Sequence, residues 1–334
     1  MESHLWILQL ALFGKKYSIL HHFFVSLLLL CYVAQAKEIH PTFKLKSMGM
    51  VNDFVINHGK IYIANDAGSI DIFDLESQSL VEQILLEPLY TKMGKIQSPN
   101  IISVDYLNGK VLIVSIGIYS FRNVWIYENH ELKNIVDDSK KLTIKEARFL
   151  NDEQIFYGTF SSEIILQDTS EQYNLYKKQL TQSTMGDIAL SEDKSKVVYS
   201  DESGEVRLVD TKTSEVLEVF SSLNVDNVYH VAYANSIIIT AGQDRRVGVY
   251  QPNQKPYYLK SDFLVYCVGI TPSGKTGVYS RGEEADLQLF NTKTKEQTDR
   301  LVGHNGLVGQ IKFINEKELF SSERSEYVYY WQLD

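Results

Sequence analysis

Short alternating runs of apolar and polar residues return along this chain at a nearly fixed spacing. Each run has about six residues and usually carries an aromatic or large apolar residue near its end; the seven copies are residues 69–74, 123–128, 163–168, 205–210, 246–251, 286–291 and 327–332. Equivalent positions in successive copies are 40 to 42 residues apart, except for a gap of 54 between the first two. A period of about 40–45 residues is typical of β-propeller blades.

The fourth repeat shows the repeating unit most clearly. Alternating runs at residues 186–191, 197–200, 205–210 and 215–220 are separated by turns rich in Asp, Ser, Gly and Lys. This pattern predicts a meander of four antiparallel strands. The second run of each repeat is the most apolar, so we expect it to lie buried between neighbouring blades. Helical periodicity is nearly absent after residue 45, and we therefore predict an all-β, seven-bladed β-propeller.

The two ends of the repeat array complement each other. The last repeat ends three residues before the C-terminus and lacks its outermost strand, whereas residues 42–47 form a run with no repeat before them. We expect this N-terminal run to complete the seventh blade, because ring closure removes the exposed sheet edges of an open array. The 54-residue gap predicts a longer loop at residues 87–99 and a longer hairpin tip at residues 117–121. Insertions of this kind often map to a binding face.

Residues 42–332 resemble the WD40-type propeller superfamily. Residues 240–250 look like the third-strand motif of that family, with Asp244 in the turn, and Gly303-His304 looks like its Gly-His opening. The match is degenerate, because only the seventh repeat ends in Trp, at Trp331, where Gln332 replaces the family's Asp. The resemblance implies a seven-bladed fold in which the family's Asp–His–Ser–Trp hydrogen-bond tetrad is incomplete in most blades.

The first 36 residues differ from the repeats. A pair of lysines precedes an apolar run at residues 23–33, and Ala34-Gln35-Ala36 follows it. A basic start, a short apolar run and an A-x-A site predict a secretory signal peptide at residues 1–36, with one propeller domain at residues 37–334 in the periplasm. A retained membrane anchor is the alternative, although the run is short for a bilayer span. A lipoprotein would need a small residue in place of Leu30.

Charge and cysteine content narrow the function classes. Cleavage would remove Glu2, Lys15 and Lys16 and change the formal net charge from −9 to −10. An acidic protein of this kind is a poor partner for nucleic acid or for an anionic membrane surface. The one cysteine outside the leader, Cys267, lies in an apolar run, and we expect it to be a buried small hydrophobe rather than a reactive thiol. We also expect the mature protein to be a monomer.

Common catalytic motifs are missing from the sequence. Haem-attachment, zinc-protease, serine-hydrolase and phosphate-loop patterns are not present. We therefore predict a non-catalytic protein with no cofactor and no metal site. The histidines after the leader are widely spaced, and His304 is best explained as a structural residue at a blade opening.

A propeller can still assemble a site in its central channel from several blades. The candidates are Asp53, Asp105, Arg148, Asp187 and His230, at the expected starts of innermost strands. They either bind a small molecule or an ion or line a water-filled channel as solvated polar residues, and we favour the second interpretation. If the channel held a metal ion, the alternative function would be a metal-dependent hydrolase or lactonase.

Aromatic and arginine residues near predicted loops are the stronger surface signal, because these residue types dominate protein-binding hot spots. We predict a partner-binding site made of Tyr119, Phe121, Arg122, Arg245 and Arg246. The first three lie in the long hairpin, and we hypothesise that they contact the partner together.

The leader, the size, the degenerate repeats and the stretch at residues 52–73 resemble the NapL-type propellers encoded with periplasmic nitrate reductase systems. That resemblance implies an accessory, non-catalytic role in nitrate respiration, with reductase subunits or maturation factors as partners. An envelope-assembly scaffold is a further alternative, which the sequence alone does not separate from the nitrate role.

Overall fold

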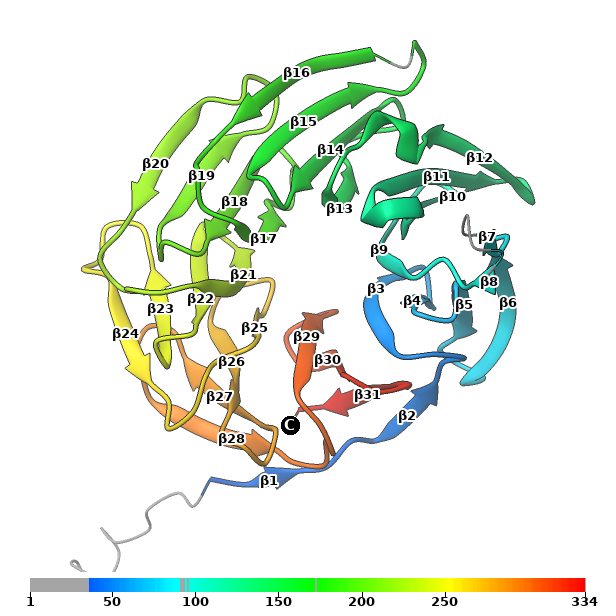
Figure 1. Cartoon of the computed structure of the whole chain (residues 1–334). Coiled ribbons are helices and arrows are strands. Elements are labelled where there is room, and N and C mark those ends of the chain that lie inside the picture. The colour runs from blue at the N-terminus through cyan, green and yellow to red at the C-terminus, as the bar shows by residue number, and fades with distance from the viewer. Residues whose placement is uncertain (1–35, 91–93, 95, 172, 334) are drawn as a thin grey trace, which may run out of the picture. The chain divides into compact units, whose positions relative to one another are not determined.

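Seven β-sheets surround a central channel in the computed structural model, which describes residues 36–90, 94, 96–171 and 173–333 (Figure 1). The helical elements among these residues are two short 3-10 helices, η1 (Ile118–Ser120) and η2 (Asp138–Lys140). Neither is long or apolar enough to cross a bilayer. The predicted all-β, seven-bladed fold is confirmed. The apolar run of the predicted signal peptide lies outside the described residues.

The blades are numbered along the chain, and in blades 1 to 6 the strands run from the channel outward. Blade 1 contains β3 (Val51–Asn57), β4 (Lys60–Asn65), β5 (Ser69–Asp74) and β6 (Ser79–Leu85). Blade 2 contains β9 (Ile101–Leu107), β10 (Lys110–Ile116), β11 (Arg122–Glu128) and β12 (Glu131–Val136). Blade 3 contains β13 (Ile144–Phe149), β14 (Gln154–Thr159), β15 (Glu163–Asp168) and β16 (Tyr173–Gln179). Blade 4 contains β17 (Met185–Leu190), β18 (Lys196–Asp201), β19 (Val206–Asp210) and β20 (Val216–Phe220).

The remaining blades follow the same order. Blade 5 contains β21 (Val228–Ala234), β22 (Ile237–Gly242), β23 (Arg246–Tyr250) and β24 (Tyr257–Lys260). Blade 6 contains β25 (Val268–Ile270), β26 (Thr276–Arg281), β27 (Asp286–Asn291), β28 (Gln297–Leu301) and, on its outer edge, β1 (Glu38–Ile39). Blade 7 contains β29 (Val308–Phe313), β30 (Glu318–Glu323), β31 (Tyr327–Gln332) and β2 (Phe43–Lys46). The segment between blades 1 and 2, predicted as a longer loop, carries a short hairpin of β7 (Leu89–Tyr90) and β8 (Ile96–Gln97).

The core lies between the blades rather than within any one of them. The second strands are buried almost throughout, as β4, β14, β18, β22 and β30 show. One apolar cluster joins Ile70 and Ile72 of blade 1 to Ile101 and Val104 of blade 2. Strands buried on both faces need β-branched and aromatic residues rather than strict alternation. The expectation that the second run of each repeat packs between neighbours is therefore confirmed.

The N-terminal strand closes the ring. β2 pairs antiparallel with β31, from Phe43 opposite Tyr330 to Lys46 opposite Tyr327, and the rings of Phe43 and Tyr330 stack with centroids 4.6 Å apart. This is the closure predicted from the incomplete seventh repeat. The structure adds a parallel pair that was not predicted, β1 on β28, in which Glu38 forms an ion pair with Arg300.

Strand direction separates the connections into two sets. Successive strands of a blade are antiparallel, so the loop from second to third strand and the connection to the next blade open on the same side. We call that side the top face. The loops from first to second and from third to fourth strand open on the bottom face.

Blade 7 contains much of the hydrogen-bond tetrad implied by the WD40 resemblance. His304 Nε2 lies 2.8 Å from Ser321 Oγ, and Trp331 Nε1 donates to the same oxygen at 2.7 Å. The carboxylate of Glu323 accepts the backbone N–H groups of Asn305 and Gly306 at 2.6 and 3.0 Å. These buried bonds fix the connection from blade 6 against β30 and β31.

Blade 5 contains a variant of the same device. Asn224 Oδ1 accepts from Thr240 Oγ1 at 2.6 Å, and Asn224 Nδ2 donates to Asp244 Oδ1 at 3.1 Å. Asn224 therefore occupies the role that His304 has in blade 7. The third strand carries Tyr250 where blade 7 has Trp331. The N–H of Gly248 donates to Thr240 Oγ1 at 3.0 Å.

We expect Leu45→Ala to destabilise the ring by about 2–5 kcal/mol, because Leu45 is a buried contact of the closing strand. The matched control is Leu217→Ala, at an exposed position of the outer strand β20, which should change the unfolding free energy by less than about 1 kcal/mol. Urea unfolding followed by tryptophan fluorescence measures both. Equal losses in the two variants would show that β2 does not hold the ring closed.

We expect His304→Asn to make the unfolding free energy less dependent on pH. Burial lowers the pKa of His304 from 6.5 to about 4, against the negative charge of Glu323. The unfolded chain therefore binds this proton more readily, so stability falls as the pH drops from about 6.5 to 4, by up to about 3 kcal/mol for this residue. Urea unfolding at pH 7 and pH 4.5 measures the change. An unaltered pH slope in the variant would contradict this assignment.

Candidate functional site

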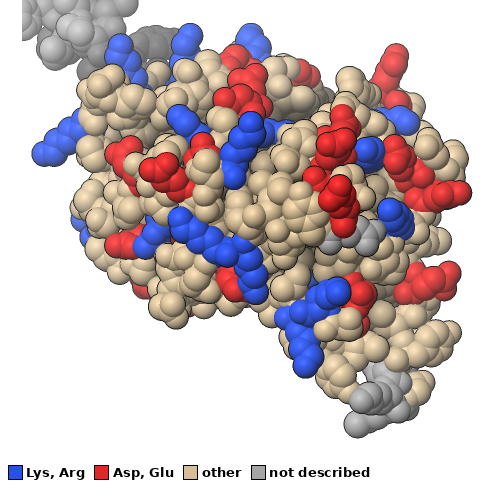
Figure 2. Space-filling view, turned by 90° about the horizontal axis from the view of Figure 1, so that it is seen from above, with Lys and Arg blue, Asp and Glu red and all other residues tan. Residues whose placement is uncertain are grey.

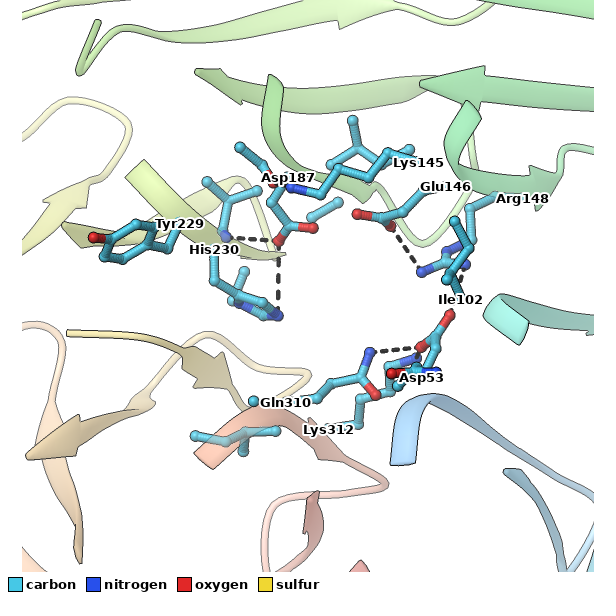
Figure 3. A pocket seen from close by; sticks show the side chains of 18 of the residues that line it. Asp53, Ile102, Lys145, Glu146, Arg148, Asp187, Tyr229, His230, Gln310 and Lys312 are labelled. Carbon is cyan, nitrogen blue, oxygen red and sulfur yellow. Dashed lines mark hydrogen bonds and ion pairs between the residues drawn. The ribbon is translucent and has the colours of Figure 1, made fainter. Parts of the chain in front are cut away.

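A cavity of about 850 Å³ occupies the channel, and its wall consists mainly of the innermost strands of the blades (Figure 3). Most of these strands begin with an irregular register, at Val51/Asp53, Ile144/Glu146, Met185/Ile188, Val228/His230 and Val308/Gln310. A bulge of this kind re-aims the side chain that follows it. The polar residues just after these irregularities are the ones that face the axis.

One strand position recurs around the axis, and we call its residues the inner ring. Each member directly precedes a buried apolar residue of an innermost strand. The members are Asp53, Ser103, Glu146, Asp187, His230, Cys267 and Gln310. They differ in residue type and share only their position in the innermost segment of each blade.

Several inner-ring side chains bond to the next blade. Asp53 Oδ2 accepts the N–H of Val104 at 3.0 Å, and Asp187 Oδ2 accepts the N–H of Val231 at 2.9 Å. Two further bonds of this type join neighbouring innermost strands, Ala147 N–H to Ser103 Oγ at 3.3 Å and Phe54 N–H to Gln310 Oε1 at 3.1 Å. Because Asp53 and Asp187 are buried and satisfied by backbone groups, they are structural links between blades. Our expectation that they are merely solvated was wrong.

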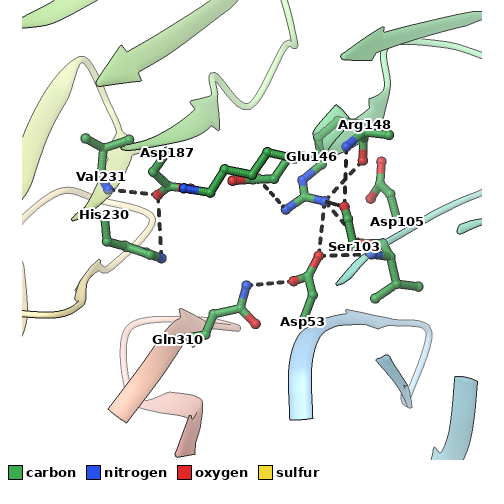
Figure 4. Close-up of polar contacts among 12 residues, drawn as sticks. Asp53, Ser103, Asp105, Glu146, Arg148, Asp187, His230, Val231 and Gln310 are labelled. Atoms are coloured by element: carbon green, nitrogen blue, oxygen red, sulfur yellow. Dashed lines mark hydrogen bonds and ion pairs between the residues drawn. The ribbon is translucent and has the colours of Figure 1, made fainter. Parts of the chain in front are cut away.

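Arg148 is the centre of an ion-pair network in the channel (Figure 4). Its guanidinium lies 3.2 Å from Asp53 Oδ2 and 2.8 Å from Glu146 Oε2, and it donates to Ser103 Oγ at 2.8 Å. Lys312 Nζ lies 3.4 Å from the other oxygen of Asp53. Burial opposes the charge on Asp53, but Lys312 and Arg148 outweigh it and lower its pKa to about 2. The carboxylate is therefore ionised and fully engaged at neutral pH.

Negative charge is less well compensated on the side of the channel toward Asp187 and His230. Burial and the negative charge of Asp187 raise the pKa of Glu146 well above its usual range. Burial lowers the pKa of His230 to about 4, so the imidazole is neutral at pH 7, with Nε2 3.7 Å from Asp187 Oδ2. His230 Nδ1 is buried and has no hydrogen-bond partner within the described part of the chain. Shifted groups in a cavity mark a candidate ligand site.

The channel does not provide an evident metal site in the residues that the structure describes. No group of three or more His, Cys, Asp or Glu side chains is placed there to hold an ion. The carboxylate of Asp53, which lines the cavity, is already paired with Arg148 and Lys312. Asp105 lies behind this wall and accepts the N–H of Phe149 at 2.8 Å.

The residues predicted to bind a partner lie on the top face, but they do not form one patch. Tyr119 is 68% exposed in η1, with a left-handed backbone at φ 56°, and Phe121 beside it is half-buried. Arg245 is exposed in the loop between β22 and β23. Arg246 packs on the ring of Tyr258 at 4.6 Å and pairs with Asp244 at 3.6 Å.

Arg122 is the correction to this set. We expected it to contact the partner from the long hairpin together with Tyr119 and Phe121. Instead it is buried, lines the channel and donates to the carbonyl oxygen of Ser120. The reason is that β11 begins at this residue, and its side chain lies on the face of the strand toward blade 3. Its guanidinium lies 5.5 Å from the ring centre of Phe160.

Some wall residues were missed by the sequence interpretation. Lys145, Glu146, Gln310 and Lys312 all line the cavity. These residues lie near the start of an innermost strand, beside its first buried apolar residues. The sequence could have indicated them by that position, but the bulges there disturb the alternation of side chains that would show which residues face the channel. Cys267 was interpreted correctly: it is a free, fully buried thiol whose pKa is raised by burial.

Comparison with known proteins supports the fold. No protein-family model matches the chain, and a search of curated proteins finds no match. Among solved structures, the crystal structure of the β-propeller domain of Cps50 (Swd1) from Myceliophteria thermophila is similar, with a TM-score of 0.69 at 13% identity. The match covers 88% of this chain and 99% of that one. Likeness at this identity shows a shared propeller fold and leaves the function to be argued from the site.

We expect Asp53→Asn to destabilise the protein by about 2–4 kcal/mol, because it leaves the partly buried cations Arg148 and Lys312 beside a neutral group. The control is Asp152→Asn, which removes the charge of a half-exposed surface carboxylate that lies 3.8 Å from Lys110 Nζ. That change should cost less than about 1 kcal/mol. Urea unfolding at pH 7 compares them, and a small loss for Asp53→Asn would mean that the network is not what joins the inner strands.

Proposed function

We propose that this protein is a periplasmic, non-catalytic propeller that binds a protein partner through its top face. The proposed partner is a subunit or maturation factor of a periplasmic nitrate reductase. The resemblance of residues 52–73 to NapL-type propellers supports the choice of partner. The signal-like leader supports the location.

The observation that carries the proposal is the distribution of exposed apolar side chains in loops and connections. In the described part of the chain, those on the top face are Met48, Met50, Tyr90, Ile96, Ile118, Tyr119, Phe160 and Val225. Among the described residues of the bottom loops, Ile314 is the one exposed large apolar residue. Exposed apolar groups gathered on one face mark a protein interaction surface rather than a chance distribution.

The outer side of the ring, which we call the rim, does not show a charged patch that would suggest a second binding surface. Acidic and basic side chains are interspersed on the side of the propeller that Figure 2 shows, without a field of one sign. A rim of mixed charge favours solubility over recognition. The outer strands also expose single apolar residues, such as Leu175 and Val219, and scattered residues of this kind need no partner to explain them.

We expect Tyr119→Ser and Met48→Ser each to weaken binding to purified periplasmic nitrate reductase at least tenfold, since hot-spot side chains contribute more than about 1.4 kcal/mol. Both residues are about two-thirds exposed, so their replacement should leave the thermal unfolding midpoint unchanged. Ile314→Ser on the bottom face is the matched control and should bind as the parent does. Biolayer interferometry measures the three affinities.

Two results would contradict the proposal in different ways. Equal weakening by Ile314→Ser would exclude the top face as the binding surface. No binding of the parent protein to the reductase or its maturation factors would exclude the nitrate-reductase partner.

A further inference from the structure

A smaller pocket of about 380 Å³ opens beside the channel at the top face, and we call it the mouth pocket. Its lining comes from blades 3, 5 and 7 and from the connections that precede blades 6 and 7: Lys145, Tyr229, His230, Tyr266, Leu307, Val308, Gly309 and Arg324. Two of these residues are permanently cationic near neutral pH, and none is acidic. This is unusual in a chain whose formal net charge is −9.

Lys145 brings a positive charge that no carboxylate compensates. Its ammonium donates to the carbonyl oxygens of Gly186 and, at 3.2 Å, of Met185. It also lies 5.5 Å from the ring centre of Phe160. Within the described residues it forms no ion pair. An ammonium carries three N–H donors, so one remains for a ligand.

Arg324 brings a second uncompensated charge. It lies on the loop between β30 and β31, where its backbone N–H donates to Leu307 O at 2.9 Å. Its exposed side chain makes neither a hydrogen bond nor an ion pair to the described residues. A guanidinium is a planar fork of donors that suits two oxygens of one oxyanion.

The deeper channel shows that this lack of partners is local. Arg148 and Lys312 are both paired with Asp53. The nearest carboxylates on the wall are engaged as well, because Glu146 pairs with Arg148 and Asp187 accepts the N–H of Val231. Arg122, on the wider cavity wall, is also without an ion pair, and its buried Nε has no acceptor among the described residues. The upper end of the channel is therefore the cationic end.

Apart from the neutral imidazole of His230, the rest of the mouth pocket is mainly apolar. The rings of Tyr229 and Tyr266 stack with centroids 5.6 Å apart and an interplanar angle of 15°, and the Tyr229 hydroxyl donates to Gln243 at 2.7 Å. Leu307 and Val308 complete this wall. A bare inorganic anion would leave these surfaces in contact with water, whereas an organic stem next to the anionic group would cover them.

We propose that the mouth pocket binds an organic carboxylate, with its oxygens on Arg324 and Lys145 and its stem against Tyr229 and Tyr266. The carboxylate belongs either to a free small acid or to an acidic side chain of a protein. The inference goes beyond the proposed function and does not depend on a reductase partner, because small probes test it directly.

The experiment is calorimetric titration of the purified protein with benzoate and with the peptide acetyl-Gly-Glu-Gly-amide, whose Gln counterpart is the neutral control. We expect Arg324→Gln to weaken binding at least tenfold. Gly309→Leu should block it, since a Cβ at Gly309 meets no atom within 4 Å and a side chain there grows into the pocket. Arg281→Gln, a partly exposed arginine on the same face that does not line the pocket, should stay within twofold of the parent.

The titrations with benzoate and with the peptides distinguish the two sources of the carboxylate. Binding of benzoate supports a free acid, and binding of the Glu peptide alone supports an acidic side chain. Equal binding of the Glu and Gln peptides, or of benzoate by Arg324→Gln and the parent, would overturn the inference. Inorganic phosphate binding as tightly as benzoate would contradict the role of the apolar wall. Unchanged thermal midpoints show that the variants are folded.

Discussion

The structure depends on one constraint: no blade can cover its own second strand. These strands are buried on both faces, so each sheet needs a neighbour on either side. An open row would leave two sheets uncovered and two edges exposed. The pairing of β2 with β31 removes both problems at once, because the strand that leads into blade 1 is also the outermost strand of blade 7. Ring closure is therefore a condition for the core, and not an addition to it.

Closure has a consequence at the axis, where seven strands converge and their polar side chains face one another. The inner ring meets this crowding with bonds from side chains to the backbone of the next blade, as Asp53 and Asp187 show. Carboxylates brought so close need cations, and Arg148 and Lys312 supply them. In the deeper channel both cations are paired with Asp53, whereas the cations at the upper end have no ion-pair partner among the described residues. The imbalance, rather than any single residue, distinguishes the mouth pocket.

The repeat period predicted the strands well, since a strand of fixed length and a turn recur with each blade. The last predicted run, residues 327–332, coincides with β31. The parallel strand β1 was not predictable, because two residues carry no period and their partner β28 is distant in sequence. Asn224 was also missed. It has the role that His304 has in blade 7, and an asparagine at this position is not part of the sequence motif that we looked for.

The candidate site was less predictable than the fold, for a physical reason. Side chains alternate between faces along a strand, so a slip of one residue reverses which of them face the channel. The register irregularities at the start of β13 and β21 introduce such a slip. Alternation in the sequence therefore could not show that Glu146 and Lys145 line the cavity. The same limit explains Arg122, whose position next to Tyr119 in sequence does not bring it to the same surface.

The top and bottom faces differ because their connections span different distances. Several bottom turns are two-residue reversals with positive φ at both positions, such as His58-Gly59 and Asn108-Gly109, and such turns match the strand twist but have no room for long side-chain surfaces. The connections between blades must instead run from the outer strand back to the axis. That path places Met48 on the top face and Tyr266 beside the channel mouth. Since the same segments carry the exposed apolar groups and frame the unpaired cations, a partner that covers the top face would also close the mouth pocket.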